Sequence, residues 1–210
     1  TYQHPDNDNL LIMVATDRIS THDVIHKGLV PWKWKTLTKM SNFWFDHFSK
    51  HPDTWNIPNQ LATREKFPKD FPIEYRESTV IVKKMTPLPI EAIMRGYLYW
   101  SAFKWYDSDT WYLATGEFVW KWLHKCSKFD EPIFTPSTKS DGWDENVNFD
   151  QMISTLEKWL IDNEYKDIDA LELANQVKDY TQRLYKKANT VAQERWLILW
   201  DTKIEYGLDI

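Results

Sequence analysis

The sequence predicts an α+β protein in two lobes, and three observations support this fold class. Strand patterns with one helix fill the first third of the chain, and amphipathic helical patterns follow late, at residues 150–160 and 169–194. The two-proline segment at residues 86–89 separates two strand-like runs and suits a hinge. Strands and helices in separate stretches are typical of α+β folds. The predicted N-terminal β-rich lobe covers residues 1–84, and the predicted C-terminal α+β lobe covers residues 85–210.

Strands dominate the front of the chain. The apolar residues 10–15 predict a buried strand, after which residues 17–20 are expected to turn the chain. Aromatic residues at helical spacing predict a helix over residues 38–48. The segment 49–77 is rich in proline and charge and predicts a surface connection. Residues 78–85 are β-branched and predict another strand.

The back of the chain alternates strands and helices. Residues 90–98 predict a strand, residues 107–131 predict loops, and residues 197–206 predict a last strand. Asp169 is the expected N-cap of the second helix. The buried side of that helix is predicted to carry Leu171, Ala174, Val177, Leu184, Ala188 and Val191.

Bulk composition excludes several function classes. The formal net charge of −5 disfavours a general nucleic-acid or membrane-surface binder. No apolar run approaches the ~20 residues that span a bilayer. The one cysteine, Cys126, cannot form an internal disulfide, which fits a cytoplasmic protein. Oligomeric state stays open, with a homo-oligomer as one option.

Three charged side chains share one face of the last predicted strand. Successive strand residues point to opposite faces, so Asp201, Lys203 and Glu205 lie on the same side. Burying such a charged face costs free energy unless it contacts water, a metal or a ligand. Carboxylates suit Mg²⁺ and an ammonium suits phosphate, so a nucleotide site is one interpretation. A solvated face with a salt bridge between residues i and i+2 is the other.

Arg95 and Gly96 lie near the end of the strand predicted at residues 90–98. An arginine fork pairs with carboxylate or phosphate, Gly96 would let the backbone approach a ligand, and Ser101 adds a hydroxyl. The alternative is a surface arginine beside a tight bend.

Two further polar clusters are candidates. The carboxylates of Asp144 and Glu145 suit an amine or a cation, or else they complement a helix N-terminus. Asp17 and Ser20 follow a buried strand, where polar loops often line a site, although plain turn chemistry explains them too. His22 and His26 lack a third ligand, which argues against zinc.

Six ordered blocks of this sequence resemble the SAICAR synthetase (phosphoribosylaminoimidazole-succinocarboxamide synthase) family. The blocks are ATDRISTHDV, LTKMSNFWF, VIVKKMTPLPIEAIMRGYL, EPIFTPSTK, DENVNF and DTKIEYGLD. They occur in the family's order over nearly the whole chain. The resemblance implies an ATP-dependent ligase of purine biosynthesis, in which ATP phosphorylates the carboxylate of carboxyaminoimidazole ribonucleotide (CAIR) and L-aspartate displaces phosphate to give SAICAR.

The resemblance also implies a fold and a set of site residues. The fold is an ATP-grasp-related α+β fold, with ATP between a smaller antiparallel β lobe and a larger α+β lobe, and with Mg²⁺ as the metal. Arg95 and Ser101 match positions that hold the ribonucleotide, and Lys203 and Glu205 match the phosphate- and Mg²⁺-binding pair. The remaining matches fall on the adenine-binding strand or at other positions of the cleft: Val82, Lys83 and Met85 on the strand; Lys139, Asp144 and Asp17 in the cleft.

The chain departs from the family pattern in its termini and its tryptophans. The resemblance implies a phosphate loop just before Thr1, and an acidic Mg²⁺ ligand with a Ser-Arg pair after Ile210. An inactive or truncated family member is therefore an alternative. The chain has 13 Trp and 5 Gly, whereas average glycine usage of about 7% predicts roughly 15.

Our hypothesis is that many tryptophans stand where glycine belongs, because some lineages read UGA as Gly and others as Trp. UGG codons at these positions would contradict it. Trp44 and Trp159 suit apolar helical contexts and fall outside the hypothesis. The candidates are Trp32, Trp34, Trp100, Trp105, Trp111, Trp120, Trp122, Trp143 and Trp196, with Trp55 and Trp200 fitting less well.

Two other function classes compete with the ligase. A Trp-rich binding module, for sugars as one example, would show a coplanar row of exposed tryptophans. Another ATP-using enzyme, such as a small-molecule kinase, would have an Arg95 pocket suited to a sugar hydroxyl. A cleft that joins Arg95, Lys139, Lys203 and Glu205 would favour the ligase.

Overall fold

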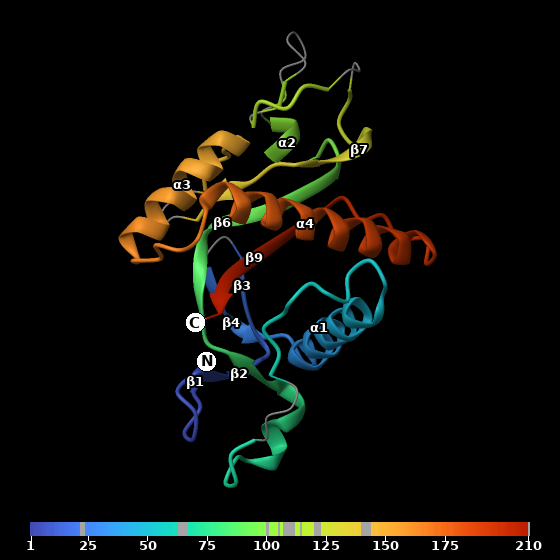
Figure 1. The fold of residues 1–210 in the computed structure, drawn as a ribbon. Coiled ribbons are helices and arrows are strands. Elements are labelled where there is room, and N and C mark those ends of the chain that lie inside the picture. Colours follow the sequence, from blue (N-terminus) through green and yellow to red (C-terminus); the bar gives the residue numbers. More distant parts are fainter. Residues whose placement is uncertain are drawn as a thin grey trace. The chain divides into compact units, whose positions relative to one another are not determined.

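The computed structural model shows a mixed α+β fold with antiparallel sheets, as predicted (Figure 1). Among the described helices, none is long and apolar enough to span a bilayer. The structure describes residues 1–21, 24–62, 67–99, 101–104, 106, 112–113, 115–119, 123–139 and 144–209.

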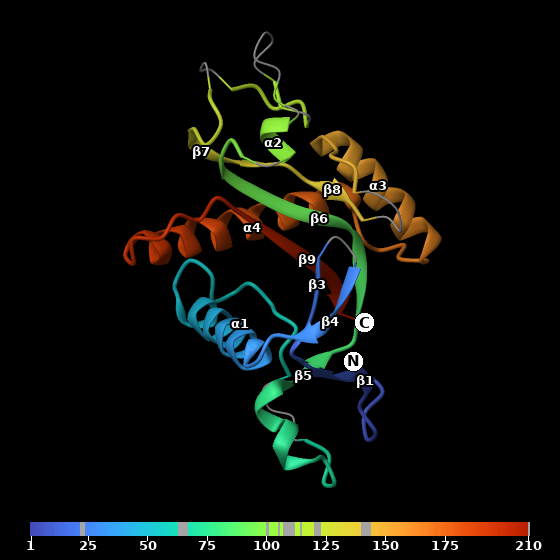
Figure 2. The same ribbon diagram turned by 180° about the vertical axis from the view of Figure 1, so that it is seen from behind.

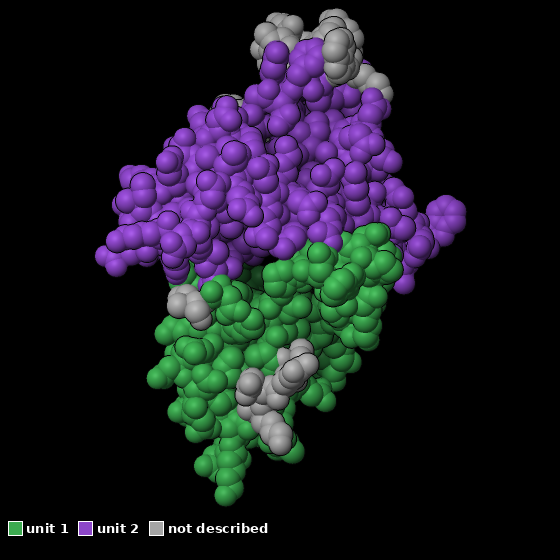
Figure 3. Space-filling model, in the orientation of Figure 1, with its two compact units in different colours: residues 1–86, 209–210 green, residues 87–208 purple. Residues whose placement is uncertain are grey.

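The chain forms two compact units, which are coloured separately in Figure 3. Unit 1 contains Thr1–Thr86 together with Asp209–Ile210, and unit 2 contains Pro87–Leu208.

Unit 1 is built on a three-stranded antiparallel sheet in the order β1-β2-β5. Its strands are β1 (Tyr2–Gln3), β2 (Leu10–Val14) and β5 (Thr79–Lys83), so both predicted strands are confirmed. The predicted turn at residues 17–20 is wrong. Arg18–Thr21 is strand β3, which pairs with β4 (Val24–Leu29) in a separate hairpin.

The helix of unit 1, α1, spans Lys33–Lys50 and begins five residues earlier than predicted. Its expected apolar face is only half-buried, since Met40 and Phe43 are exposed while the Trp44 and Phe48 rings stack at 5.3 Å between centroids. The connection after it includes the 3₁₀ helix η1 (Ile73–Ser78).

Unit 2 is built around strand β6 (Met85–Tyr97), which pairs with β7 (Lys128–Phe134), β8 (Ser137–Thr138) and β9 (Asp201–Asp209). The predicted break at the two prolines is wrong, because β6 runs through both. Pairing with β8 begins only at Ile90, so on that side neither proline is required to donate a hydrogen bond.

Two helices cover one face of this sheet (Figures 1 and 2). Helix α3 (Phe149–Asp162) has a capping box made by Asn148 and Gln151, and α4 (Ala170–Gln193) has the predicted cap, with Asp169 accepting from Glu172 N at 2.8 Å. Their apolar faces pack on Leu88, Ile90, Ala92 and Met94 of β6.

The buried face of α4 was predicted in part. Ala174, Val177, Ala188 and Val191 are buried as expected, whereas Leu171 is exposed and Leu184 is half-buried. Leu173, Thr181 and Tyr185 complete the buried face, because it starts two residues later than the predicted stripe. A smaller cluster between β6 and β7 packs around Leu98 beside the short helix α2 (Ser101–Lys104).

Helix α4 ends in a Schellman motif whose left-handed residue is Trp196. Trp196 N donates to Gln193 O at 3.0 Å, Leu197 N donates to Ala192 O at 2.9 Å, and the φ of Trp196 is 59°. Glycine is the usual residue at this position. Trp32, the N-cap of α1, also has a left-handed φ of 69°.

The glycine hypothesis is therefore supported at two of its positions. The φ angles of Trp34, Trp55 and Trp200 are not left-handed, so the backbone conformation does not favour glycine at these positions. The other candidates lie outside the described residues: Trp100, Trp105, Trp111, Trp120, Trp122 and Trp143.

Trp196→Gly is expected to raise the free energy of unfolding by about 1 kcal/mol, since the left-handed conformation costs an L-residue roughly 1–2 kcal/mol. The Trp196 side chain is 96% exposed, so little packing is lost. Trp159→Gly is the matched control. It should destabilise the protein, because Trp159 lies within α3 and stacks on Tyr165. Denaturant unfolding measures both variants, and a less stable Trp196→Gly protein would contradict the glycine hypothesis at this position.

Candidate active site

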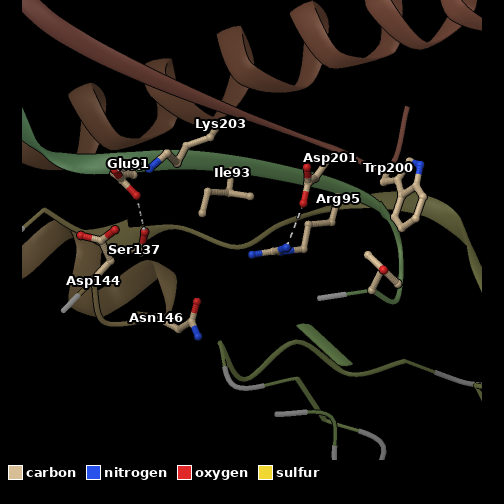
Figure 4. A pocket seen from close by; sticks show the side chains of 10 residues that line it. Glu91, Ile93, Arg95, Ser137, Asp144, Asn146, Trp200, Asp201 and Lys203 are labelled. Atoms are coloured by element: carbon tan, nitrogen blue, oxygen red, sulfur yellow. Dashed lines mark hydrogen bonds and ion pairs between the residues drawn. The ribbon is translucent and has the colours of Figure 1, made fainter. Parts of the chain in front are cut away.

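A cavity of about 600 Å³ lies on the face of β6 opposite the helices, entirely within unit 2 (Figure 4). It combines charged side chains, two aromatic rings and one aliphatic side chain. The lining residues are Glu91, Ile93, Arg95, Tyr99, Ser137, Asp144, Asn146, Trp200, Asp201 and Lys203.

Strand geometry explains which β6 residues reach the cavity. Glu91, Ile93 and Arg95 line it, while the residues between them, such as Ala92 and Met94, belong to the helix-covered core. This two-residue alternation is what a pleated strand requires. Strand β6 therefore divides its side chains between the site and the core.

Arg95 is held rigidly at the cavity wall. It is only 5% exposed, its Nε donates to Thr135 Oγ1 at 2.9 Å, and one terminal nitrogen donates to Asp201 Oδ2 at 3.1 Å. Burial lowers the pKa of Arg95, whereas the Asp201 carboxylate raises it. The net effect lowers the pKa of Arg95, yet a guanidinium keeps its positive charge in a protein.

Glu91 holds the second cation of the cavity. Its carboxylate is 4% exposed and accepts from Lys203 Nζ at 2.6 Å and from Ser137 Oγ at 3.3 Å. The hydrogen bond that Lys203 donates to Glu91 is the largest cause that raises the pKa of Lys203, and burial acts in the opposite direction. Lys203 is therefore a fixed positive charge near neutral pH.

All three charges on the outer face of β9 have partners in unit 2. Asp201 pairs with Arg95, Lys203 pairs with Glu91, and Glu205 pairs with Lys139 at 2.5 Å. The strand begins at Asp201, four residues later than predicted, but the predicted shared face is present. These ion pairs join β9 to other segments, unlike the i,i+2 salt bridge along the strand that the alternative interpretation expected. Arg95 and Lys203 nevertheless line the cavity, where a ligand could contact them.

The predicted site residues of unit 2 are only partly gathered. Arg95, Asp144, Asp201 and Lys203 line one cavity, whereas Lys139 and Glu205 pair with each other outside its lining. Ser101 begins α2, and its side chain lies outside the described part of the structure.

The predicted residues of unit 1 are distributed over its sheet and hairpin. Val82 is buried in β5, and Lys83 donates to Asp209. Asp17 Oδ1 accepts from Trp34 N at 3.2 Å in the first turn of α1, and Ser20 is exposed on β3. Met85 begins β6.

Sequence reasoning missed several lining residues, above all Glu91. The signal was present, since Glu91 lies four residues before Arg95 on one strand and so shares its face. Asn146, which follows the Asp144 and Glu145 carboxylates, forms an isolated β-bridge with Ser137 of β8. Tyr99 and Trp200 carried no pattern that marked them as site residues.

Gly96 has a different role from the one expected. A Cβ added at Gly96 would collide with the hydroxyl of Tyr185 on α4, not with anything in the cavity. Tyr185 donates that hydroxyl to Leu199 O at 2.8 Å. Gly96 therefore makes room for a core tyrosine that ties α4 to the segment before β9.

Comparison with known proteins decides the family. A sequence model of the SAICAR synthetase family matches residues 1–210. The chain belongs to the SAICAR synthetase family. The phosphoribosylaminoimidazole-succinocarboxamide synthase of Xanthomonas campestris pv. campestris (strain B100) is 38% identical over 211 residues, which cover 98% of this chain and 61% of that protein.

Solved SAICAR synthetase structures share the fold. The SAICAR-synthase from Saccharomyces cerevisiae complexed with SAICAR superposes with a TM-score of 0.77 at 32% identity, over 97% of this chain and 64% of that one. A SAICAR synthetase in complex with ADP has a TM-score of 0.64 over 98% of this chain and 71% of that one, and at 18% identity it supports the fold alone. The chain spans about three fifths of the length of the curated relatives it matches.

Proposed function

We propose that the protein is an ATP-dependent ligase that joins L-aspartate to CAIR to give SAICAR, ADP and phosphate. The observation that carries this proposal is the unit 2 cavity, where two fixed cations, Arg95 and Lys203, stand beside open space in a member of this family. A cavity with a rigid guanidinium and an ammonium suits a ligand with several anionic groups. Both carboxylated ribonucleotides and ATP are such ligands.

The proposed reaction has two steps, phosphorylation of the carboxylate and attack by the amine. A carboxylate oxygen of the ribonucleotide attacks the γ-phosphorus of ATP, so that an O–P bond forms and ADP leaves. The amine of aspartate then attacks the acyl carbon, loses a proton, and phosphate departs with one of the former carboxylate oxygens. Such chemistry depends mainly on positioning and on neutralising charge.

Two carboxylates of the protein, Asp201 and Glu91, pair with Arg95 and Lys203 before an anionic ligand binds. Asp201 is about half-exposed, so an incoming anion can displace it from Arg95 while Asp201 turns to water. Glu91 is buried and keeps Lys203 aimed along the cavity wall. The preformed geometry lowers the entropy that binding would otherwise cost.

The proposed nucleotide contacts are Val82, Lys83, Met85 and Lys203. Because the Val82 side chain is buried, its contribution would come from the backbone. Lys83 forms an ion pair with Asp209, which a phosphate group could replace. Lys139, Asp144, Ser101, Asp17 and Ser20 remain proposed substrate contacts with less specific roles.

Magnesium is proposed to arrive with ATP, where it would neutralise phosphate charge. Among the described residues, no group of three His, Cys, Asp or Glu side chains could hold a metal. Mg²⁺ usually needs only one or two protein carboxylates besides water and phosphate. The donor chemistry of Glu205, with Asp201 as a second candidate, fits that requirement.

The competing binding module lacks support in the described tryptophans. Trp32, Trp55 and Trp196 are strongly exposed but come from three separate segments.

Exposed Cys126 makes no disulfide, and we propose the cytoplasm as the site of action.

An ADP-release assay tests the proposed function. The protein, with any residues that its gene encodes on either side of this chain, is supplied with ATP, Mg²⁺, L-aspartate and CAIR. We expect sustained ADP release only with all components, and none when CAIR is omitted. Equal release without CAIR, or with a sugar in its place, would contradict the ligase and favour another ATP-using enzyme.

A further inference from the structure

Two aromatic rings line the cavity. Tyr99 and Trp200 both line it, and their rings meet edge to face, with centroids 4.0 Å apart and planes inclined at 73°. Trp200 immediately precedes Asp201, so Trp200 adjoins the Arg95–Asp201 pair (Figure 4).

Backbone hydrogen bonds hold the two segments that carry these rings. Gly96 N donates to Trp200 O at 2.8 Å, which ties the start of β9 to β6. Leu98, the neighbour of Tyr99, donates to Ser127 O and accepts from Cys126 N, each at 2.8 Å. Lys125 Nζ lies 5.4 Å from the centroid of the Tyr99 ring. The backbone at both residues is therefore held in place, and the two rings contact each other.

Trp200 differs from the tryptophans that occupy glycine-like backbone positions. Its φ is not left-handed, and its side chain is only 40% exposed because it packs on Tyr99. Trp196, four residues earlier, is left-handed and almost fully exposed. The Trp200 side chain is thus part of the cavity wall.

Flat apolar surface beside fixed cations selects a particular ligand class. Ile93, Tyr99 and Trp200 supply the apolar surface, and Arg95 with Lys203 supplies the positive charge. Aromatic side chains stack favourably on the faces of planar heterocycles. We propose that Tyr99 and Trp200 recognise the planar ring of an anionic heterocyclic ligand and discriminate against anions that lack a ring. This inference rests on the proposed function, since it assigns the ring subsite of the same cavity.

Calorimetric titration with two probes tests the ring subsite. 5-Aminoimidazole ribonucleotide carries the ring and a phosphate, whereas ribose 5-phosphate carries the phosphate alone. We expect the wild-type protein to bind the ribonucleotide at least about tenfold more tightly. In Trp200→Ala and in Tyr99→Ala that preference should fall to about twofold or less, with ribose 5-phosphate affinity unchanged. Trp200→Phe should restore most of it.

Trp55→Ala is the matched control, because Trp55 is an exposed tryptophan of unit 1. An unchanged preference in Trp200→Ala would overturn the inference, and so would a wild-type protein that binds neither probe. Tighter ribonucleotide binding in Trp200→Ala would overturn it too, by showing that the indole fills ligand space. The probe preference is independent of ADP release, so failure of the ligase proposal and failure of the ring subsite are distinguishable.

Discussion

Arg95→Met is expected to weaken ribonucleotide binding at least about 25-fold and to abolish measurable ligase turnover. The reason is that removing one member of a buried, hydrogen-bonded charge pair costs about 2–5 kcal/mol, and each 1.4 kcal/mol is tenfold in affinity. The Asp201 carboxylate would then face the incoming anion without its counter-charge. Titration calorimetry and the ADP-release assay measure the two effects.

Thr135→Val separates the charge of Arg95 from its structural hydrogen bond. The buried Thr135 hydroxyl accepts from Arg95 Nε, so this variant loses the same bond but keeps the guanidinium. Its free energy of unfolding should fall by about 1–3 kcal/mol, while ribonucleotide affinity stays within about threefold of wild type. If Arg95→Met bound as well as Thr135→Val, Arg95 would be a structural residue only.

Gly96→Ala is expected to destabilise the protein by about 3 kcal/mol. The added methyl group would overlap the Tyr185 hydroxyl, and Tyr185 is almost fully buried. Moving that ring aside breaks its hydrogen bond to Leu199 O, so overpacking and a lost bond add together. Denaturant unfolding gives the change in free energy.

Tyr185→Phe provides the partner for a double-mutant cycle. Alone it should cost about 1 kcal/mol for the lost hydrogen bond. With Gly96→Ala it should recover about 2 kcal/mol, because the nearest remaining ring atom, Cζ, would be 3.1 Å from the new Cβ. Additive effects of the two substitutions would contradict the packing role assigned to Gly96.

Local patterns predicted most of the helices and strands in this chain. The Asp169 cap and the apolar stripe placed α4 to within one residue at each end. The β3–β4 hairpin was missed because its short polar strands, which contain Arg18 and Ser20, have the composition of a turn. The prolines of β6 suggested a break, since the sequence does not reveal which backbone groups need a partner.

The site was less predictable, because its contacts cross the sheet. Period two showed that Asp201, Lys203 and Glu205 share a face, but not that Glu91 and Arg95 on β6 lie opposite them. Strand register is a long-range property that single-strand patterns do not contain. Residue patterns and the family resemblance together supplied Arg95 and Lys203, and only the three-dimensional structure supplied Glu91, Tyr99 and Trp200.

The ADP-release assay tests the central claim most directly when both carboxylate oxygens of CAIR carry oxygen-18. Mass spectrometry of the released phosphate and of the nucleotide product follows the label. A ligase that phosphorylates this carboxylate before aspartate attacks it must transfer one labelled oxygen to each phosphate and retain the other in the new amide. Phosphate without label, formed at the same rate as ADP, would contradict the account.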